Sequence, residues 1–111
     1  MQPFQLYERA LLPKGFEYPE LLAQFSRTGA YPTIEPWWFI DAGTKAGDLF
    51  YSVRTHDGRN LVPFAKMDDD LACFDGDDAS RNPAVHALVL DESGRSYSFR
   101  DFAEWLLAAG R

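Results

Sequence analysis

Hydrophobic residues recur at helical spacing near the start of the chain. Phe4, Tyr7 and Leu11 lie three and four residues apart, and Pro13 and Gly15 follow them. Apolar residues at this spacing fall on one face of a helix, while Pro and Gly interrupt it. The pattern therefore predicts a first helix that ends before Pro13.

A second short helix is predicted over about residues 19–28. Pro19 suits the first turn, where its missing N–H costs nothing, and Leu22 and Phe25 share one face. Gly29 stands just past the end, where a left-handed backbone conformation commonly closes a helix.

Aromatic and β-branched runs separated by turn residues then predict a meander of antiparallel strands. The predicted strands are Trp37–Ile40, Asp48–Arg54, Asn60–Lys66, Leu71–Phe74 and Ala84–Leu90, with tight turns at Asp57-Gly58 and Glu92-Ser93-Gly94. Residues 48–54 alternate between apolar and polar, which indicates a half-buried strand. Pro63 predicts an edge position or a bulge. Residues 84–90 are apolar except for His86, which predicts an interior strand.

The last predicted element is a helix over 99 to about 109, ended by Gly110. Ser98 and Asp101 match a capping box, in which each side chain bonds a backbone N–H of the first turn. The predicted buried stripe comprises Phe99, Phe102, Ala103 and Leu106. The element order predicts an α+β domain, with N-terminal and C-terminal helices packed on one side of an antiparallel sheet.

The length of 111 residues suffices for one hydrophobic core and not for two, so residues 1–111 are expected to form one domain. Aromatic residues make up 15% of the chain, more ring surface than so small a domain buries completely, so some rings are expected at the surface as contact groups. The single cysteine fits a reducing compartment, and the sequence shows neither a signal peptide nor an apolar run long enough to span a bilayer. We therefore expect a cytoplasmic protein.

Negative charge is concentrated in the second half of the chain. Residues 1–66 hold 7 acids and 7 bases, whereas residues 67–111 hold 10 acids and 4 bases, which accounts for the whole net charge of -6. This concentration of negative charge disfavours nucleic acid and anionic membranes as ligands and favours a basic protein partner.

Six carboxylates occupy eleven consecutive residues without an intervening base. They are Asp68, Asp69, Asp70, Asp75, Asp77 and Asp78. Three interpretations fit such a run: a pair of solvated loops, a patch for a basic partner, and a metal site. The run lacks the residue spacing of a calcium loop, so neither a metal nor a cofactor is expected.

Trp37 and Trp38 are consecutive, so in an extended segment one ring faces the core and the other faces outward. The outward ring either packs against a neighbouring loop or serves as an interface anchor, because aromatic rings dominate binding hot spots. Both interpretations stay open at this point.

No constellation of catalytic residues stands out. Cys73 lies between Ala72 and Phe74, where a small buried hydrophobe is expected, and His86 is expected to be a hydrogen-bonded core residue. His56 falls in a predicted turn. The chain has no phosphate-binding glycine loop, nucleophile elbow or zinc-ligand spacing, so no enzymatic activity is expected.

Several segments together resemble one known family. They are Leu12-Pro13, Glu35-Pro36-Trp37-Trp38-Phe39, Leu61-Val62-Pro63-Phe64-Ala65-Lys66, Asp68-Asp69-Asp70-Leu71-Ala72-Cys73-Phe74, and 99–106. In this order they resemble the SUKH superfamily of Smi/Knr-like proteins. The resemblance implies an α+β fold and no catalysis. Bacterial members are mostly immunity proteins that neutralise toxins, many of them nucleases or deaminases, while a fungal branch is linked to cell-wall regulation. The matching positions that carry over are Asp68, Asp69, Asp70, Trp37 and Trp38.

The leading hypothesis is an immunity-type protein that binds a toxin domain and occludes its basic surface. The acidic run would mimic substrate phosphates, and an exposed tryptophan would supply contact area. A second hypothesis is a general interaction or regulatory module with an endogenous partner, and a third is an Asp-rich metal-dependent hydrolase. The sequence makes no prediction of the oligomeric state.

Overall fold

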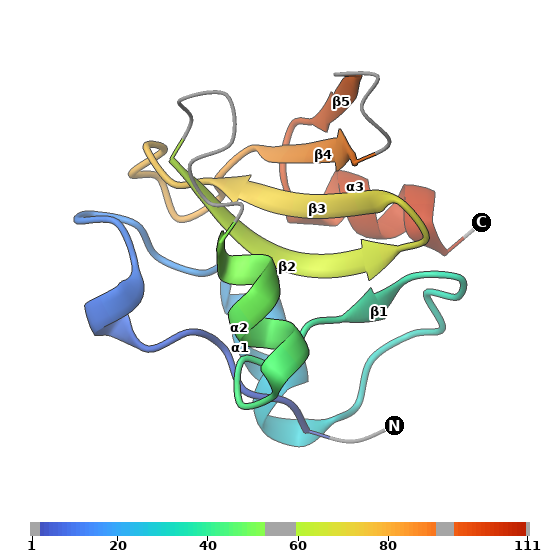
Figure 1. Cartoon of the computed structure of the whole chain (residues 1–111), viewed down its shortest axis with the longest axis horizontal. Coiled ribbons are helices and arrows are strands. Elements are labelled where there is room, and N and C mark those ends of the chain that lie inside the picture. Colours follow the sequence, from blue (N-terminus) through green and yellow to red (C-terminus); the bar gives the residue numbers. More distant parts are fainter. Residues whose placement is uncertain (1–2, 53–59, 91–94, 111) are drawn as a thin grey trace.

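The computed structural model describes residues 3–52, 60–90 and 95–110. Its elements, in chain order, are η1 (Arg9–Leu11), α1 (Glu20–Thr28), β1 (Trp38–Phe39), α2 (Lys45–Tyr51), β2 (Leu61–Met67), β3 (Asp70–Asp75), β4 (Val85–Val89), β5 (Ser96–Phe99) and α3 (Phe102–Ala109). The strands form one antiparallel sheet in the order β1-β2-β3-β4-β5, as Figure 1 shows. The predicted α+β class, with an N-terminal and a C-terminal helix flanking an antiparallel sheet, is confirmed.

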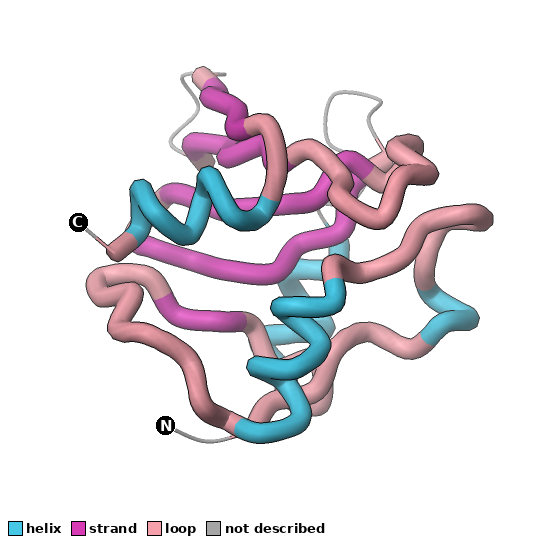
Figure 2. Tube along the Cα trace, turned by 180° about the vertical axis from the view of Figure 1, so that it is seen from behind, coloured by secondary structure: helices cyan, strands magenta, loops and turns pink. Residues whose placement is uncertain are grey.

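Helices α1 and α3 lie on one face of the sheet, and α2 lies on the other (Figures 1 and 2). Aromatic rings fill the space between α3 and the sheet: Phe64 stacks on Phe74 at 4.2 Å between ring centroids, and both rings contact Phe102. The predicted N-terminal and C-terminal helices thus share one side as α1 and α3, whereas α2, which was not predicted, covers the other side. No helix in residues 3–52, 60–90 or 95–110 has both the length and the apolar character needed to cross a bilayer.

Helix α2 replaces most of the strand predicted over Asp48–Arg54, so that prediction is wrong. The Thr44 hydroxyl caps the helix by accepting a hydrogen bond from the Gly47 N–H at 3.1 Å. Gly47 packs so closely against the preceding loop that an added Cβ would lie 2.3 Å from the Asp41 carbonyl oxygen. The hydrogen-bonded cap and this close backbone packing favour a helix here, although the alternation of apolar and polar residues predicted a strand. Val53, Arg54 and the predicted turn at Asp57-Gly58 lie outside the described residues.

The first predicted helix is also largely wrong. Only the short 3₁₀ turn η1 forms, and Phe4 and Tyr7 lie in chain without regular secondary structure before it. Both are nevertheless buried: Phe4 stacks on Phe39 at 5.0 Å, and the Tyr7 hydroxyl donates to the Gly47 carbonyl at 2.5 Å. Their spacing therefore reflects contacts with the rest of the fold and not a helix face.

The second predicted helix is confirmed as α1. Pro19 stands at its N-cap, and Leu22 and Phe25 are buried. Gly29 closes the helix with φ 70°, and its N–H donates to the Phe25 carbonyl at 2.8 Å. This left-handed conformation suits glycine because it has no Cβ.

The structure confirms both predictions about the middle strands. The register of β2 shifts between Pro63 and Ala65, so the strand accommodates its proline at a bulge although it lies inside the sheet. Strand β4 is interior, as its apolar sequence predicted, because it pairs with β3 on one side and β5 on the other.

Helix α3 begins later than predicted, and the capping box is wrong. Ser98 and Phe99 belong to β5, where they pair with His86 and Val85. Asp101 is the N-cap itself, and its carboxylate accepts a hydrogen bond from the Glu104 N–H at 3.0 Å. Gly110 follows the helix, as predicted. The buried residues of α3 are Phe102, Trp105 and Ala109, whereas Ala103 is exposed and Leu106 is half-buried. The predicted turn at 92–94 lies outside the described residues.

Candidate protein-binding site

The structure divides the six aspartates between the two ends of β3. Asp68 and Asp69 form the β2–β3 turn and Asp70 begins β3; these three are the turn group. Asp75 ends β3, and Asp77 and Asp78 follow in the next loop; these three are the loop group. At about 3.3 Å per residue, the strand separates the two groups by roughly 16 Å. The six carboxylates therefore form two separate groups and not one continuous patch.

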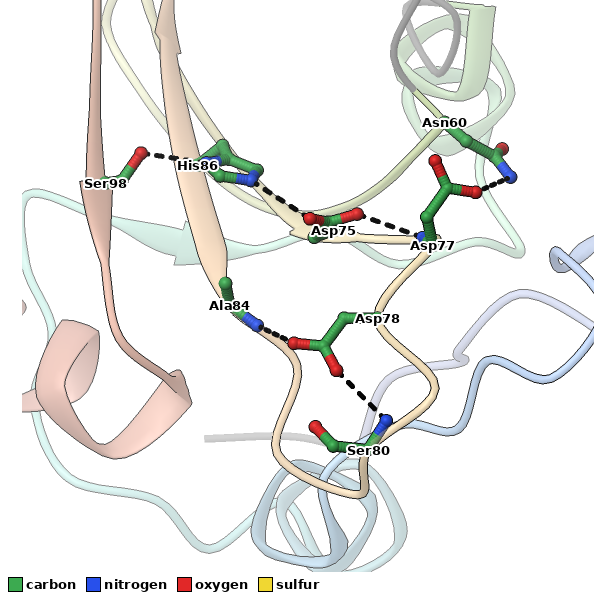
Figure 3. A network of polar contacts seen from close by, with 8 residues as sticks. All are labelled: Asn60, Asp75, Asp77, Asp78, Ser80, Ala84, His86 and Ser98. Atoms are coloured by element: carbon green, nitrogen blue, oxygen red, sulfur yellow. Dashed lines mark hydrogen bonds and ion pairs between the residues drawn. The ribbon is translucent and has the colours of Figure 1, made fainter.

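The loop group organises its own loop, as Figure 3 shows. The Asp78 carboxylate accepts hydrogen bonds from the backbone N–H groups of Ser80 and Ala84, both at 3.0 Å. Hydrogen bonds from the Ser80 hydroxyl and backbone N–H lower the pKa of Asp78. Because this carboxylate is bonded on both oxygens within the chain, its role is to hold the loop.

The other two members of the loop group are bonded in the same way. The Asp75 carboxylate accepts a hydrogen bond from the Asp77 N–H at 3.0 Å, and the Asp77 carboxylate accepts one from the Asn60 side-chain amide at 3.2 Å (Figure 3). These bonds join the end of β3 to the residue that precedes β2. The loop group therefore acts mainly in folding.

The turn group is more open. Asp68 and Asp69 are exposed, and within the described chain no side chain or backbone group donates a hydrogen bond to either carboxylate. Asp68 adopts a φ of 50°, a left-handed conformation that is uncommon for residues other than glycine. Asp70 is half-buried and accepts a hydrogen bond from the Tyr97 hydroxyl at 2.5 Å. Burial and this hydrogen bond raise the pKa of Tyr97.

The two tryptophans point to opposite faces of β1, as the sequence predicted. Trp37 is 8% exposed and packs edge-on against Trp105 with ring centroids 5.3 Å apart. Trp38 remains 45% exposed and leans on Phe50 at 5.8 Å between centroids. Trp38 is thus available for an outside contact, as is Tyr97 at 39% exposure among the described residues.

Trp38 lies at the same end of the sheet as the turn group. Its pairing partner on β2 is Lys66, two residues before Asp68. The Lys66 ammonium stands 6.0 Å from the centroid of the Phe50 ring. We call this region the Trp38 surface; it comprises Trp38, Phe50, Lys66, Asp68 and Asp69.

A hollow beside the Trp38 surface was not foreseen from the sequence. It is lined by Tyr31, Pro32, Thr33, Ile34, Glu35, Trp37 and Trp38. Glu35 is exposed and adds a third carboxylate near Trp38. Glu35 precedes Trp38 by only three residues, so the sequence already places it near the tryptophan, although it stands apart from the acidic run.

His86 takes part in a row of polar side chains across three strands. Its Nδ1 lies 2.8 Å from the Ser98 hydroxyl on β5, and its Nε2 lies 3.5 Å from the Asp75 carboxylate on β3 (Figure 3). His86 is hydrogen-bonded as expected, but it is half-buried and not a core residue, which corrects that part of the prediction. Cys73, opposite it on β3, is 0% exposed, as expected. The row links neighbouring strands, which is a structural role. His56 lies outside the described residues.

The described parts of the chain contain no cluster of three or more His, Cys, Asp or Glu side chains that could hold a metal ion. In particular, the roughly 16 Å between the turn group and the loop group exceeds the reach of one ion, whose oxygen ligands lie within about 2.6 Å.

Comparisons with known proteins leave the site to be interpreted from its geometry. No protein-family model matches the chain, and no match was found among curated proteins or solved structures.

Proposed function

We propose that this chain is a cytoplasmic protein-binding domain of the immunity type, which neutralises a toxin by covering the basic surface of the toxin domain. The observation that carries the proposal is the exposed Trp38 ring at the same end of the sheet as the carboxylates of Asp68 and Asp69. The resemblance to SUKH proteins favours a toxin of the nuclease or deaminase class.

Trp38 has the properties of an interface anchor. Its ring is 45% exposed yet rests on Phe50, so little side-chain freedom remains to be lost when a partner covers it. Residues of this kind at the centre of an interface contribute about 2 kcal/mol or more to binding. The adjacent hollow provides room for a side chain of the partner.

The turn group supplies the charge. Asp68 and Asp69 are exposed in the β2–β3 turn, and their carboxylates accept no hydrogen bond within the described chain, so the charges are open to solvent. A nuclease needs a basic surface to bind phosphates, and exposed carboxylates would be attracted to it. The attraction would speed association and weaken as salt is added.

The loop group has a secondary part in this proposal. Its carboxylates contribute to the net charge of -6 and hence to long-range attraction, but their hydrogen bonds are made within the chain. The contacts therefore belong to the Trp38 surface, and not to all six aspartates.

The proposal predicts that the product of an adjacent gene carries the toxin domain, and it is tested by measuring binding to that product. Trp38→Ala should weaken binding roughly 30-fold, the equivalent of about 2 kcal/mol. The double variant Asp68→Asn with Asp69→Asn should slow association about tenfold at low salt and reduce its salt dependence. Glu8→Gln with Asp77→Asn is the matched control, because it removes the same charge outside the Trp38 surface.

The proposal fails if Trp38→Ala binds as the natural protein does, or if the control pair slows association as much as the turn pair. Binding that depends on Trp38 but is directed to an endogenous protein, with no affinity for the toxin domain, would favour the regulatory alternative.

A further inference from the structure

The hollow beside the Trp38 surface lies in the segment that joins α1 to β1. Its volume is about 240 Å³, whereas pockets that take a whole small-molecule ligand measure roughly 300–1,000 Å³. The hollow is therefore suited to a single side chain of a partner. Its lining combines three aromatic residues, Tyr31, Trp37 and Trp38, with one charged residue, Glu35.

The charge in this hollow is negative and unpaired. Glu35 is exposed, and within the described residues its carboxylate makes no hydrogen bond or ion pair. Residues 28–44, which contain this segment, include no Lys, Arg or His. Lys66, which strand pairing places opposite Trp38, has its ammonium 6.0 Å from the centroid of the Phe50 ring. The hollow is therefore complementary to a positively charged group.

The aromatic residues of the hollow are held in place by contacts with the rest of the fold. Tyr31 packs edge-on against Phe39 with ring centroids 5.0 Å apart, and Trp37 packs in the same way against Trp105 at 5.3 Å. Trp38 rests on the ring below it, as described above. Because these side chains are already ordered, a partner group that enters the hollow immobilises little that was free before.

We propose that this hollow takes an arginine side chain of the partner, whose guanidinium contacts the aromatic residues and pairs with the Glu35 carboxylate. The inference rests on the proposed function, since it names the group of the toxin domain that enters.

The combination of rings and a carboxylate favours arginine over lysine. A guanidinium is planar, stacks on aromatic rings, and pairs with a carboxylate through two parallel hydrogen bonds. The lysine ammonium is a compact and more strongly hydrated charge, and it has no flat face to stack. Arginine is also a residue with which proteins bind phosphates. An arginine held in the hollow would therefore be withdrawn from the substrate of a nuclease.

A small probe tests the hollow without a toxin. The chain, labelled with nitrogen-15, is titrated with N-acetyl-arginine N-methylamide while the indole N–H signal of Trp38 is followed by NMR; Trp38→Phe identifies that signal by its loss. We expect a saturable shift with a Kd on the order of 1 mM. The citrulline counterpart, which has nearly the same shape but no charge, should bind about tenfold more weakly.

Glu35→Gln should weaken binding of the arginine probe about fivefold or more, because it removes the carboxylate and keeps the size of the side chain. Glu8→Gln is the matched control, since it removes the same charge at an exposed position outside the hollow, and it should leave probe binding unchanged. Equal binding of the arginine and citrulline probes, or equal effects of the two variants, would overturn the proposal.

A double-mutant cycle with the toxin domain identifies the arginine. Each arginine of the toxin's basic surface is replaced by alanine, and binding is measured to the natural chain and to Glu35→Gln. One replacement should weaken binding to the natural chain roughly tenfold and binding to Glu35→Gln by only about twofold. If no arginine is coupled to Glu35, the proposal is overturned even where toxin binding depends on Trp38. Probe binding by a chain that has no affinity for the toxin domain would support the arginine site and contradict the proposed function, so the two fail separately.

Discussion

Asp68 shows how a single residue can be placed at a cost to the fold. Its φ of 50° lies in the left-handed region, where an L side chain other than glycine loses on the order of 1 kcal/mol. The position follows β2 directly, in the β2–β3 turn, and is exposed. A carboxylate at a position better suited to glycine is consistent with a role in binding.

We therefore predict that Asp68→Gly raises the free energy of unfolding by about 0.5–1 kcal/mol while it weakens binding to the toxin domain. The measurement is urea denaturation followed by circular dichroism. Asp68→Ala is the control, because it removes the charge but keeps the Cβ, and it should bring no such gain. A glycine variant less stable than the natural chain would show that the carboxylate itself supports the turn.

Asp78 illustrates the opposite case, a carboxylate that serves the fold. Its two oxygens accept hydrogen bonds from Ser80 and Ala84, and removing them with Asp78→Ala should cost about 1–2 kcal/mol of unfolding free energy. Since the folded state lowers the pKa of Asp78, its contribution is complete above the unfolded pKa of about 4 and is lost as the pH falls through the lower folded value.

The pH dependence of unfolding checks this assignment. Between about pH 5 and pH 3 the natural chain should lose more stability than an Asp78→Asn variant, in which this group no longer titrates. Parallel pH profiles for the two proteins would contradict the assignment of the bonds to the ionised carboxylate.

The helices and strands that were predicted correctly are those whose ends depend on residues close by in the sequence. Helix α1 was found because Pro19 and Gly29 mark its two ends, and the bulge in β2 was found because Pro63 lacks an N–H. The start of α3 was missed because the pairing of Ser98 and Phe99 with β4 lies far along the chain. Phe4 and Tyr7 were misassigned for the same reason, since distant residues bury them.

Helix α2 provides the sharpest test of such a contact. Alanine normally stabilises a helix relative to glycine by about 1 kcal/mol. Gly47→Ala should nevertheless lower the free energy of unfolding by about 1–3 kcal/mol, because its Cβ would lie 2.3 Å from the Asp41 carbonyl oxygen. Ala46→Gly, at an exposed position of the same helix, should cost about 1 kcal/mol from propensity alone. Urea denaturation measures the free energy of unfolding of both variants. A Gly47→Ala protein more stable than the natural chain would mean that the loop before α2 moves to accommodate the added Cβ.

For the molecule as a whole, closeness in the sequence was a poor guide to the site. Six aspartates within eleven residues are divided because the six residues of β3 are extended between them. Conversely, Trp38 comes to lie at the same end of the sheet as Asp68 because β1 pairs with β2. Residue types and the alternation at Trp37 and Trp38 could be predicted, whereas the composition of the surface could not, since it depends on the pairing of β1 with β2.

The burial of Cys73 means that its thiol can be used to follow the opening of the sheet. The single thiol of the chain sits on the middle strand of the sheet at 0% exposure. A thiol-specific reagent can therefore label the natural chain only when that strand opens, so the labelling rate measures how often the sheet comes apart. Every variant that retains this one cysteine can be ranked in the same way, at low concentration and without denaturant.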